Sequence, residues 1–380
     1  MNTSIPVRQK IFFPNLDGLR FFSFFAVFLL HCLVTDSAII HEAAWFRLAK
    51  QLSHADLGVS FFFVLSGFLI TYLLLQEKRW RGKIDVGSFY VRRVLRIWPL
   101  YFFCVFYGFV ITPYLRTLMG QSPVENANPY LSATFLNNFD RIRNGPPQSA
   151  VLGVLWSIAV EEQFYLIWPL LLLVIPGRFT QSIFFMVIAS SLVFRVFVRG
   201  EAAENHTLGV ISDMAIGGLG AFLAMRKNFF EKIFSRMHRG WTLIFYAAVA
   251  LLVLFWYQVF TLPALFVPRR VIMACCFVWI ILEQNYNPKS YFKISNFKII
   301  SRLGKYTYAL YCLHPIAISM TVLALRQTGL NHDAWQILFI QIPVSLLLSI
   351  LLSYVSYHAF EKHFLKLKEK FAYITKGEKI

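Results

Sequence analysis

Ten apolar runs, each about as long as one bilayer crossing, constrain the fold of this chain most strongly. A run of roughly 17 to 25 apolar residues is read as one membrane-spanning helix. The composition agrees, since 57% of the 380 residues are hydrophobic and only 15% are charged, whereas about a quarter of the residues are charged in soluble domains. We therefore predict an all-α, polytopic membrane helix bundle. The ten predicted helices cover residues 16–34, 57–76, 95–114, 151–175, 182–199, 207–225, 240–261, 266–284, 304–325 and 335–359.

The loops between these runs predict one domain and its orientation. No repeat is evident and no loop is long enough for a second globular domain, so residues 1–380 should form a single membrane domain, with a helical bundle at about 11–360 and a basic tail at 361–380. Most of the 37 lysines and arginines lie on the side of the N-terminus, and such residues collect on the cytoplasmic side. Both termini are therefore predicted to be cytoplasmic, with the amphipathic tail on the inner leaflet. This topology explains the net charge of +18, so nucleic acid is not an expected partner.

The five cysteines argue against a disulfide framework and against a metal site. All of them lie within apolar runs, their number is odd, and no CxxC or Cys/His spacing typical of zinc occurs. We therefore expect no bound metal. The longest predicted outer loop, residues 114–150, is rich in Asn, Pro, Gln and Ser. Such a loop either covers or binds an extracytoplasmic substrate, or it simply connects two helices over the surface.

The first apolar run contains an arginine and a histidine, which hydrocarbon does not tolerate without compensation. Arg20 and His31 are 11 residues apart, so they leave the same face of a helix, about 16 Å apart along its axis. Ionisable groups within a span usually face the bundle interior or a watery cavity, and they are candidates for function. The alternative is that Arg20 extends to the lipid interface and that His31 makes one satisfied hydrogen bond in the core.

Two adjacent acids in the fourth run, within LWSIAVEEQFYLIWP, are the most informative local feature. Glu161 shares its helix face with Ser157 and Tyr165, whereas Glu162 lies among aliphatic side chains. An unpaired carboxylate in hydrocarbon is expensive, so Glu161 should pair with His31 or with an arginine. A carboxylate–imidazole pair would supply a base that works near neutral pH and has a defined tautomer.

The third run begins with RRVLRIWPLY, in which Arg93 and Arg96 share a face. Membrane topology accounts for part of this charge but not for two arginines that continue into the span. Guanidinium groups suit phosphates, and a phosphate-bearing donor would find such groups here and at Arg20. In the second run, Ser66 and Gly67 within FFFVLSGFLIT permit close helix packing, which is the default role of such a pair. A binding role would require that Gly67 let a ligand approach the backbone.

Two further polar residues in apolar runs have open roles. Asp213, in SDMAIGGLGAFLA, is either catalytic or part of a structural salt bridge, for example to Arg195. His314 precedes a proline in YALYCLHPIAI, and it either lines a cavity or is a hydrogen-bonded residue at a helix kink.

Taken together, these stretches resemble one family, the acyltransferase-3 superfamily of bacterial integral membrane O-acyltransferases. The first acid of the EEQFY sequence is the characteristic one in that family, which agrees with the choice of Glu161. Some members carry an appended extracytoplasmic esterase-like domain, which is not expected here. The matching motifs run in the family's order across nearly the whole chain, and they are NLDGLR followed by His31, FFFVLSGFLIT, RRVLRIWPLY, LWSIAVEEQFYLIWP, YALYCLHP and YHAFEKHFLKL.

The resemblance implies a function and a location. Members transfer an acyl group, commonly acetyl, from cytoplasmic acyl-coenzyme A to a hydroxyl of an extracytoplasmic glycan. The expected location is the bacterial cytoplasmic (inner) membrane. The expected partners are acyl-coenzyme A as donor, membrane lipids, and a glycan acceptor such as O-antigen, exopolysaccharide or a lipid-linked sugar.

The resemblance also suggests roles for individual residues. His31, oriented by Glu161, would deprotonate the acceptor hydroxyl or briefly carry the acyl group itself. The donor-binding candidates are Arg20, Arg93 and Arg96 for the phosphates and Ser66 and Gly67 beside the pantetheine. Weaker candidates for substrate binding are Asp17, Tyr165, Asp213 and His314.

A transporter or flippase for a lipid-linked glycan is the competing class. Such a protein would also need basic residues and a polar core. It gives no reason for a paired histidine and glutamate, and it predicts movement of the glycan without acyl-coenzyme A.

Overall fold

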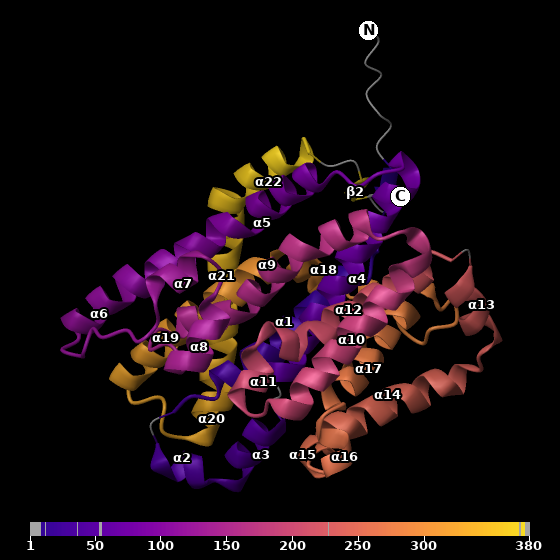
Figure 1. Ribbon diagram of the computed structural model, residues 1–380. Coiled ribbons are helices and arrows are strands. Elements are labelled where there is room, and N and C mark those ends of the chain that lie inside the picture. Colours follow the sequence, from indigo (N-terminus) through magenta and orange to yellow (C-terminus); the bar gives the residue numbers. More distant parts are fainter. Residues whose placement is uncertain are drawn as a thin grey trace.

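The chain folds into a bundle of long helices in a computed structural model that describes residues 9–11, 13–35, 37–52, 55–226, 228–371 and 374–376 (Figure 1). Each predicted apolar run coincides with a long helix, because an apolar segment of this length satisfies its backbone groups most easily as a helix. These helices are α1 (Leu16–Cys32), α4 (Ala55–Arg81), α5 (Val86–Phe106), α9 (Ala150–Val174), α10 (Thr180–Phe197), α12 (Thr207–Ala224), α14 (Arg239–Leu254), α17 (Arg269–Tyr286), α19 (Thr307–Gln327) and α21 (Ile342–Ser356).

Seven helical segments of the described residues are long and apolar enough to cross a membrane. The bent pair of α13 (Phe229–Arg236) and α14 would make eight if it forms one span. The all-helical membrane class is therefore confirmed. The count of ten stays a prediction, because α1, α14 and α17 coincide with predicted runs but are not among the seven. The orientation of the termini also stays a prediction.

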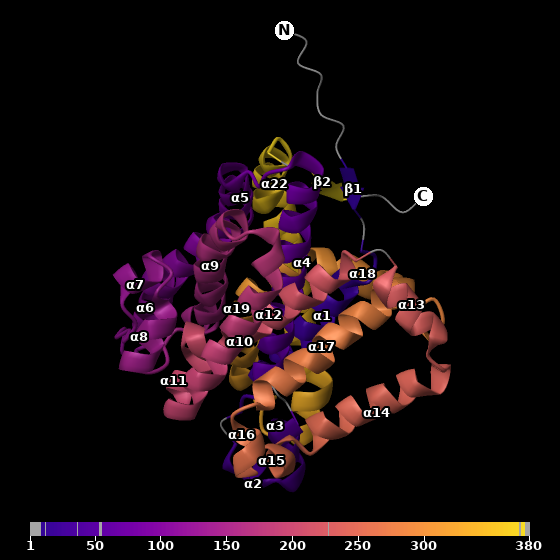
Figure 2. The same cartoon turned by 45° about the vertical axis from the view of Figure 1, so that its right-hand side comes forward.

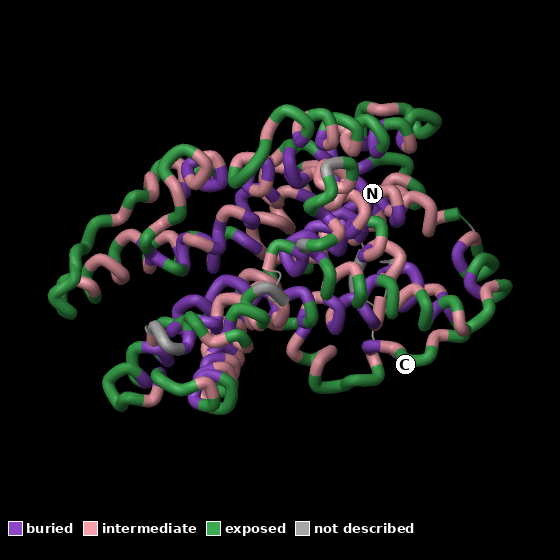
Figure 3. The backbone as a smooth tube through the Cα atoms, turned by 90° about the horizontal axis from the view of Figure 1, so that it is seen from below, coloured by how far each residue is buried: buried purple, intermediate pink, exposed green. Residues whose placement is uncertain are grey.

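Helix α1 lies in the middle of the bundle, where it packs against α4 and α19 (Figures 1 and 2). Phe24 and Phe28 on this helix are fully buried. Figure 3 shows that buried residues are concentrated on the inner helices and that exposed residues follow the loops and the outermost helices. The helix that carries Arg20 and His31 is therefore an interior element, in agreement with their predicted place.

Helices α4 and α12 cross in close contact because each has a glycine at the crossing point. A Cβ atom on Gly67 would overlap the backbone carbonyl of Met214, and one on Gly217 would overlap the carbonyl of Val64. Gly67 therefore faces α12, and its place beside a bound donor stays a prediction. Its missing side chain serves helix packing, which was the alternative reading of the Ser-Gly pair.

The long loop after α5 folds into short helices against the bundle. Helix α5 continues through a π-helical turn (Tyr107–Ile111) into α6 (Thr112–Leu118), and α7 (Pro129–Ala133) and α8 (Asn137–Asn144) follow. The hydroxyl of Tyr101 on α5 donates to the carbonyl oxygen of Ser132 at 2.7 Å. Asn138 of α8 joins a hydrogen-bonded group with Gln163 of α9 and Thr207 of α12. The second half of the loop thus packs on the bundle, with α8 held against α9 and α12.

The C-terminal segment also packs on the bundle. A π-helical turn (Tyr357–Glu361) joins α21 to α22 (Lys362–Glu369), which lies along α5 (Figure 1). Arg92 Nη1 donates to the carbonyl oxygen of Phe371 at 2.7 Å, and β2 (Ile374–Lys376) pairs in parallel with β1 (Gln9–Ile11). The basic tail is therefore attached to protein along α22, in addition to any contact with the inner leaflet.

The remaining elements are short and connect these helices. They are α2 (Ala38–Glu42), α3 (Ala44–Leu52), η2 (Gly177–Phe179), α11 (Glu201–Asn205), α15 (Trp256–Phe260), α16 (Pro263–Phe266), η3 (Ile294–Asn296), α18 (Lys298–Leu303), η4 (Gly304–Tyr306), α20 (Ala334–Gln336) and the π-helical η5 (Ile337–Gln341).

Candidate active site

One face of α9 carries a row of small and polar residues through the interior of the bundle. Gly153, Ser157, Glu161 and Tyr165 recur every four residues and so lie on one side of the helix. We call these four residues the α9 stripe. Ser157 Oγ lies 2.7 Å from the hydroxyl oxygen of Tyr311 on α19. The Tyr165 hydroxyl bonds to Ser66 of α4. The stripe therefore faces α19 and α4.

Glu161 is bound by its own helix. The hydroxyl of Tyr165, one turn away, donates to Glu161 Oε2 at 2.8 Å. No hydrogen bond or ion pair joins Glu161 to His31 among the described residues, so the prediction that Glu161 orients His31 is wrong. Helical spacing identified the face that carries Glu161, but it could not show that a tyrosine on the same face would bind this carboxylate.

His31 is oriented by a second histidine. Its Nδ1 lies 2.8 Å from Nε2 of His314 on α19, and the two ring planes differ by 7°. His314 is fully buried, and its Nδ1 lies 2.9 Å and 3.2 Å from the carbonyl oxygens of Tyr311 and Leu310. Of the two readings left open for His314, the structure therefore supports a hydrogen-bonded residue that also contacts the predicted base.

These contacts define the tautomers. A carbonyl oxygen only accepts hydrogen bonds, so Nδ1 of His314 must carry a proton. A fully buried imidazolium without a carboxylate partner would be costly, so His314 is neutral and its Nε2 is an acceptor. Nδ1 of His31 then donates to that Nε2. The neutral His31 is left with an unprotonated Nε2, which is the atom that a general base or nucleophile requires. We call His31 and His314 the histidine end.

Three arginines gather at the other end of the α9 stripe. The guanidinium of Arg93 lies 5.6 Å from the ring centre of Tyr165, and Arg20 and Arg96 are within electrostatic range of each other. Arg20 pairs with Asp17 at 3.0 Å. In the described part of the chain, neither Arg93 nor Arg96 has a carboxylate within ion-pair distance, and Nε of Arg93 is buried without a hydrogen-bond partner.

We call Arg20, Arg93 and Arg96 the arginine end. Lys368 of α22 lies within electrostatic range of Arg93 and Arg96. The sequence alone did not single out Lys368, because its tail was expected to face lipid. This excess of positive charge suits a phosphate-bearing ligand.

Asp213 belongs to a separate ion-pair network. Its Oδ2 lies 2.7 Å from Arg270 Nη2, whereas Arg195 bonds Glu204 at 2.7 Å. The suggested Asp213–Arg195 bridge is therefore wrong, although the structural salt-bridge reading holds with Arg270 as the partner. Asp213 is fully buried within this pair, which leaves it poorly placed for substrate binding.

Glu204, in the short helix α11 outside the membrane-spanning helices, makes folding stability depend on pH. Burial raises the pKa of Glu204, but Arg270 and Arg195 outweigh this effect and hold it at about 2, below the ordinary 4.5. Its stabilising contribution is complete above pH 4.5 and is lost as the pH falls toward 2. We expect Glu204→Gln to lower the melting temperature by roughly a few degrees at pH 7. The difference should shrink as the pH is lowered.

Thermal unfolding followed by tryptophan fluorescence between pH 7 and pH 3 measures this effect. Glu201→Gln is the matched control, since Glu201 is an exposed acid on the same helix. A Glu204→Gln difference that did not change with pH would contradict the assignment.

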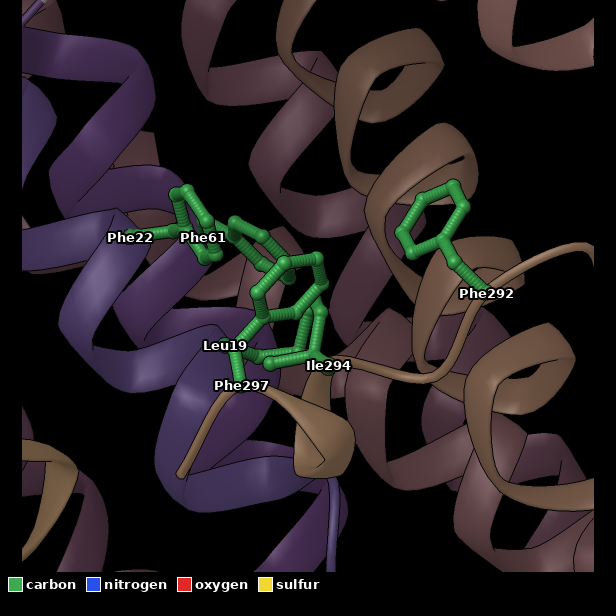
Figure 4. Close-up of a pocket in the computed structure, with 6 residues that line it drawn as sticks. All are labelled: Leu19, Phe22, Phe61, Phe292, Ile294 and Phe297. Atoms are coloured by element: carbon green, nitrogen blue, oxygen red, sulfur yellow. The ribbon is translucent and has the colours of Figure 1, made fainter. Parts of the chain in front are cut away.

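A cavity of about 460 Å³ lies between α1, α4 and the segment before α18 (Figure 4). Apolar side chains line it, including Leu19, Phe61 and Phe297. It therefore offers no group for acid–base chemistry, and the polar interior around the α9 stripe remains the candidate site.

Comparisons with known proteins identify the family of this chain. Residues 13–358 match the family model described as an acyltransferase domain, Acyl_transf_3. O-acetyltransferase OatA of Staphylococcus aureus (strain NCTC 8325 / PS 47) is 30% identical over 243 residues, which cover 58% of this chain and 37% of OatA. YrhL of Bacillus subtilis (strain 168), named as a candidate peptidoglycan O-acetyltransferase, is 33% identical over 171 residues, or 43% of this chain and 24% of YrhL.

The chain thus spans less than half the length of the curated relatives that it matches. No solved structure matches it significantly. The family model nevertheless covers almost the whole chain, including the histidine end, the α9 stripe and the arginine end. This chain belongs to the acyltransferase family that the model defines.

Proposed function

We propose that this chain is a membrane O-acyltransferase that transfers an acetyl group from acetyl-coenzyme A to a hydroxyl of a glycan. The observation that carries the proposal is the His31–His314 contact at one end of a polar stripe whose other end holds Arg93 and Arg96, which have no carboxylate within ion-pair distance among the described residues. Membership of the acyltransferase family and the names of the relatives support the reaction type.

The arginine end would hold the donor. Coenzyme A carries three phosphate groups, and guanidinium groups bind phosphate by paired, charge-assisted hydrogen bonds. Arg93 and Arg96 are available for such bonds, whereas Arg20 already pairs with Asp17. Asp17 thus occupies one nitrogen of the Arg20 guanidinium and orients that group, and we propose no contact between Asp17 and substrate. The thioester would extend from here along the α9 stripe, past Ser66 and Tyr165, toward His31.

His31 would perform the chemistry through Nε2. In one route, Nε2 takes the proton of the acceptor hydroxyl while the alkoxide attacks the thioester carbonyl, and the proton passes to the departing thiolate of coenzyme A. In the other route, Nε2 attacks the carbonyl first and expels the coenzyme A thiolate, which gives an acyl-histidine. The acceptor hydroxyl then attacks this acyl group, Nε2 leaves as the neutral imidazole nitrogen, and the hydroxyl proton neutralises the thiolate. Both routes require the tautomer that His314 imposes. Glu161 would act as a polar neighbour that orients Tyr165.

The acceptor side of the proposal follows the family. We propose a bacterial cytoplasmic membrane with both termini in the cytoplasm, which puts the arginine end toward acetyl-coenzyme A and the histidine end toward the outside. The relative YrhL is named for peptidoglycan. For this chain the acceptor class is a surface or lipid-linked glycan.

Mass spectrometry of surface glycans tests this function. A strain that lacks the gene is compared with the same strain carrying the wild-type gene. Acetyl-sized mass increments that return with the wild-type gene would support the proposal. Unchanged glycan masses with a reduced amount of surface glycan would overturn it in favour of transport.

The donor assignment gives a separate prediction. Arg93→Gln or Arg96→Gln should raise the KM for acetyl-coenzyme A by roughly tenfold to a hundredfold, because each change removes a charge-assisted phosphate contact. The value of kcat should change less, since neither residue touches the reacting carbonyl. Steady-state release of free coenzyme A thiol measures both constants. Lys83→Gln, at an exposed position between α4 and α5, is the control. An unchanged KM in both arginine variants would contradict donor binding at this end.

A further inference from the structure

Arg141 of α8 projects from the long loop toward the outer end of the α9 stripe. Its Nη1 donates to the carbonyl oxygen of Gly153 at 3.2 Å. Gly153 is the first residue of the stripe, one turn before Ser157, which bonds to Tyr311. Arg141 also lies within electrostatic range of both Tyr311 and His31. A cation from the loop therefore reaches the histidine end.

The guanidinium of Arg141 lacks an anionic partner. In the described ranges of the chain no carboxylate lies within ion-pair distance of it, and its Nε is buried without a hydrogen-bond partner. Gly153 engages only Nη1, so the edge formed by Nε and Nη2 remains free to donate. A buried donor without a partner is costly, and it is usually explained by function or by a ligand.

The backbone at Gly153, whose carbonyl oxygen binds Arg141, borders open space. A Cβ atom placed on Gly153 would meet no atom within 4 Å, although its helical neighbours Leu152 and Val154 are buried. The open space thus lies at the start of the α9 stripe, beside the residue that Arg141 contacts.

We propose that Arg141 binds an anionic oxygen group, a carboxylate or a phosphate, on the acceptor sugar, so that the acceptor is an acidic glycan. The inference rests on the proposed function, because it places the acceptor hydroxyl at Nε2 of His31. The free edge of a guanidinium presents two parallel N–H donors, which match the paired oxygens of carboxylate and phosphate. The anionic group would hold the sugar ring in one orientation and would select the hydroxyl that faces His31.

Three small sugars test the proposal by direct binding. Methyl β-D-glucuronide, methyl β-D-glucoside 6-phosphate and methyl β-D-glucoside differ only at C6, which is a carboxylate, a phosphorylated CH2OH group and a free CH2OH group, respectively. Isothermal titration calorimetry measures the affinity of each sugar for the purified full chain in nanodiscs of lipids that carry no net charge. Anionic lipid headgroups then do not compete with the sugars for Arg141. We expect at least one of the two anionic sugars to bind roughly tenfold more tightly than the neutral glucoside, and the preferred one identifies the anionic group.

Variants show whether Arg141 causes the preference for an anionic sugar. Arg141→Gln should abolish the difference between anionic and neutral sugars, and Arg141→Lys should restore only part of it, since lysine keeps the charge but not the fork. Arg143→Gln is the matched control, because Arg143 is an exposed arginine on the same helix and should leave the preference intact.

Several results would overturn the proposal. The wild type would bind all three sugars with equal affinity, or it would bind none of them. Alternatively, Arg141→Gln would keep the preference for an anionic sugar. Acetyl-coenzyme A is titrated in parallel and should bind equally to wild type and Arg141→Gln. If it failed to bind the wild type, the proposed donor would be lost, while the sugar titrations would still decide the role of Arg141.

Discussion

His31→Ala is expected to lower the turnover of acyl transfer by roughly a thousandfold, since a positioned general base typically contributes two to four orders of magnitude. The substitution removes Nε2, the one atom that both chemical routes use. Binding of acetyl-coenzyme A at the arginine end should persist, because Arg93 and Arg96 lie on another helix. The measurement is transfer of radiolabelled acetyl from acetyl-coenzyme A to a membrane and glycan fraction by the purified protein.

Two controls make the His31 result interpretable. His31→Ala should elute as a monodisperse peak in size-exclusion chromatography and should bind acetyl-coenzyme A as the wild type does. His41→Ala changes a histidine in the short helix α2 and should retain full turnover. Wild-type rates in His31→Ala would exclude both the general-base route and the acyl-histidine route.

His314→Leu is expected to lower kcat by roughly a hundredfold and to leave the KM for acetyl-coenzyme A unchanged. The leucine cannot accept the proton of His31 Nδ1, so the ring of His31 is free to rotate and to exchange tautomers. Losing the partner that sets a catalytic histidine's tautomer is known to cost up to about four orders of magnitude when that partner is a carboxylate. A neutral imidazole partner should contribute less.

A conservative variant separates this positioning role from a structural one. In His314→Gln, the amide oxygen can accept the proton of His31 Nδ1, and the amide nitrogen can donate to the carbonyl oxygen of Tyr311. His314→Gln should therefore recover a substantial part of kcat relative to His314→Leu. Equal kcat in the two variants, with both proteins folded, would show that His314 acts only through packing.

Much of the interior was readable from the sequence because helical periodicity fixes which residues share a face. The apolar runs predicted the long helices, and Arg20 and His31 both lie on one of them, the interior helix α1. The same rule predicted that Glu161 shares a face with Ser157 and Tyr165, and the structure confirms it through the hydrogen bonds of these side chains. These are properties of single helices, so a local pattern contains them.

The pairing between helices was decided only by tertiary packing. His31 meets His314 rather than Glu161, and Asp213 meets Arg270 rather than Arg195. Arg141 lies within electrostatic range of His31, and hydrogen bonds of Asn138 hold its helix, α8, against α9 and α12. Spacing along one helix gives the direction of a side chain relative to its own axis, but not which helix it faces. That choice depends on how the helices cross, and here the crossing depends on close contacts such as the one that Gly67 makes with α12.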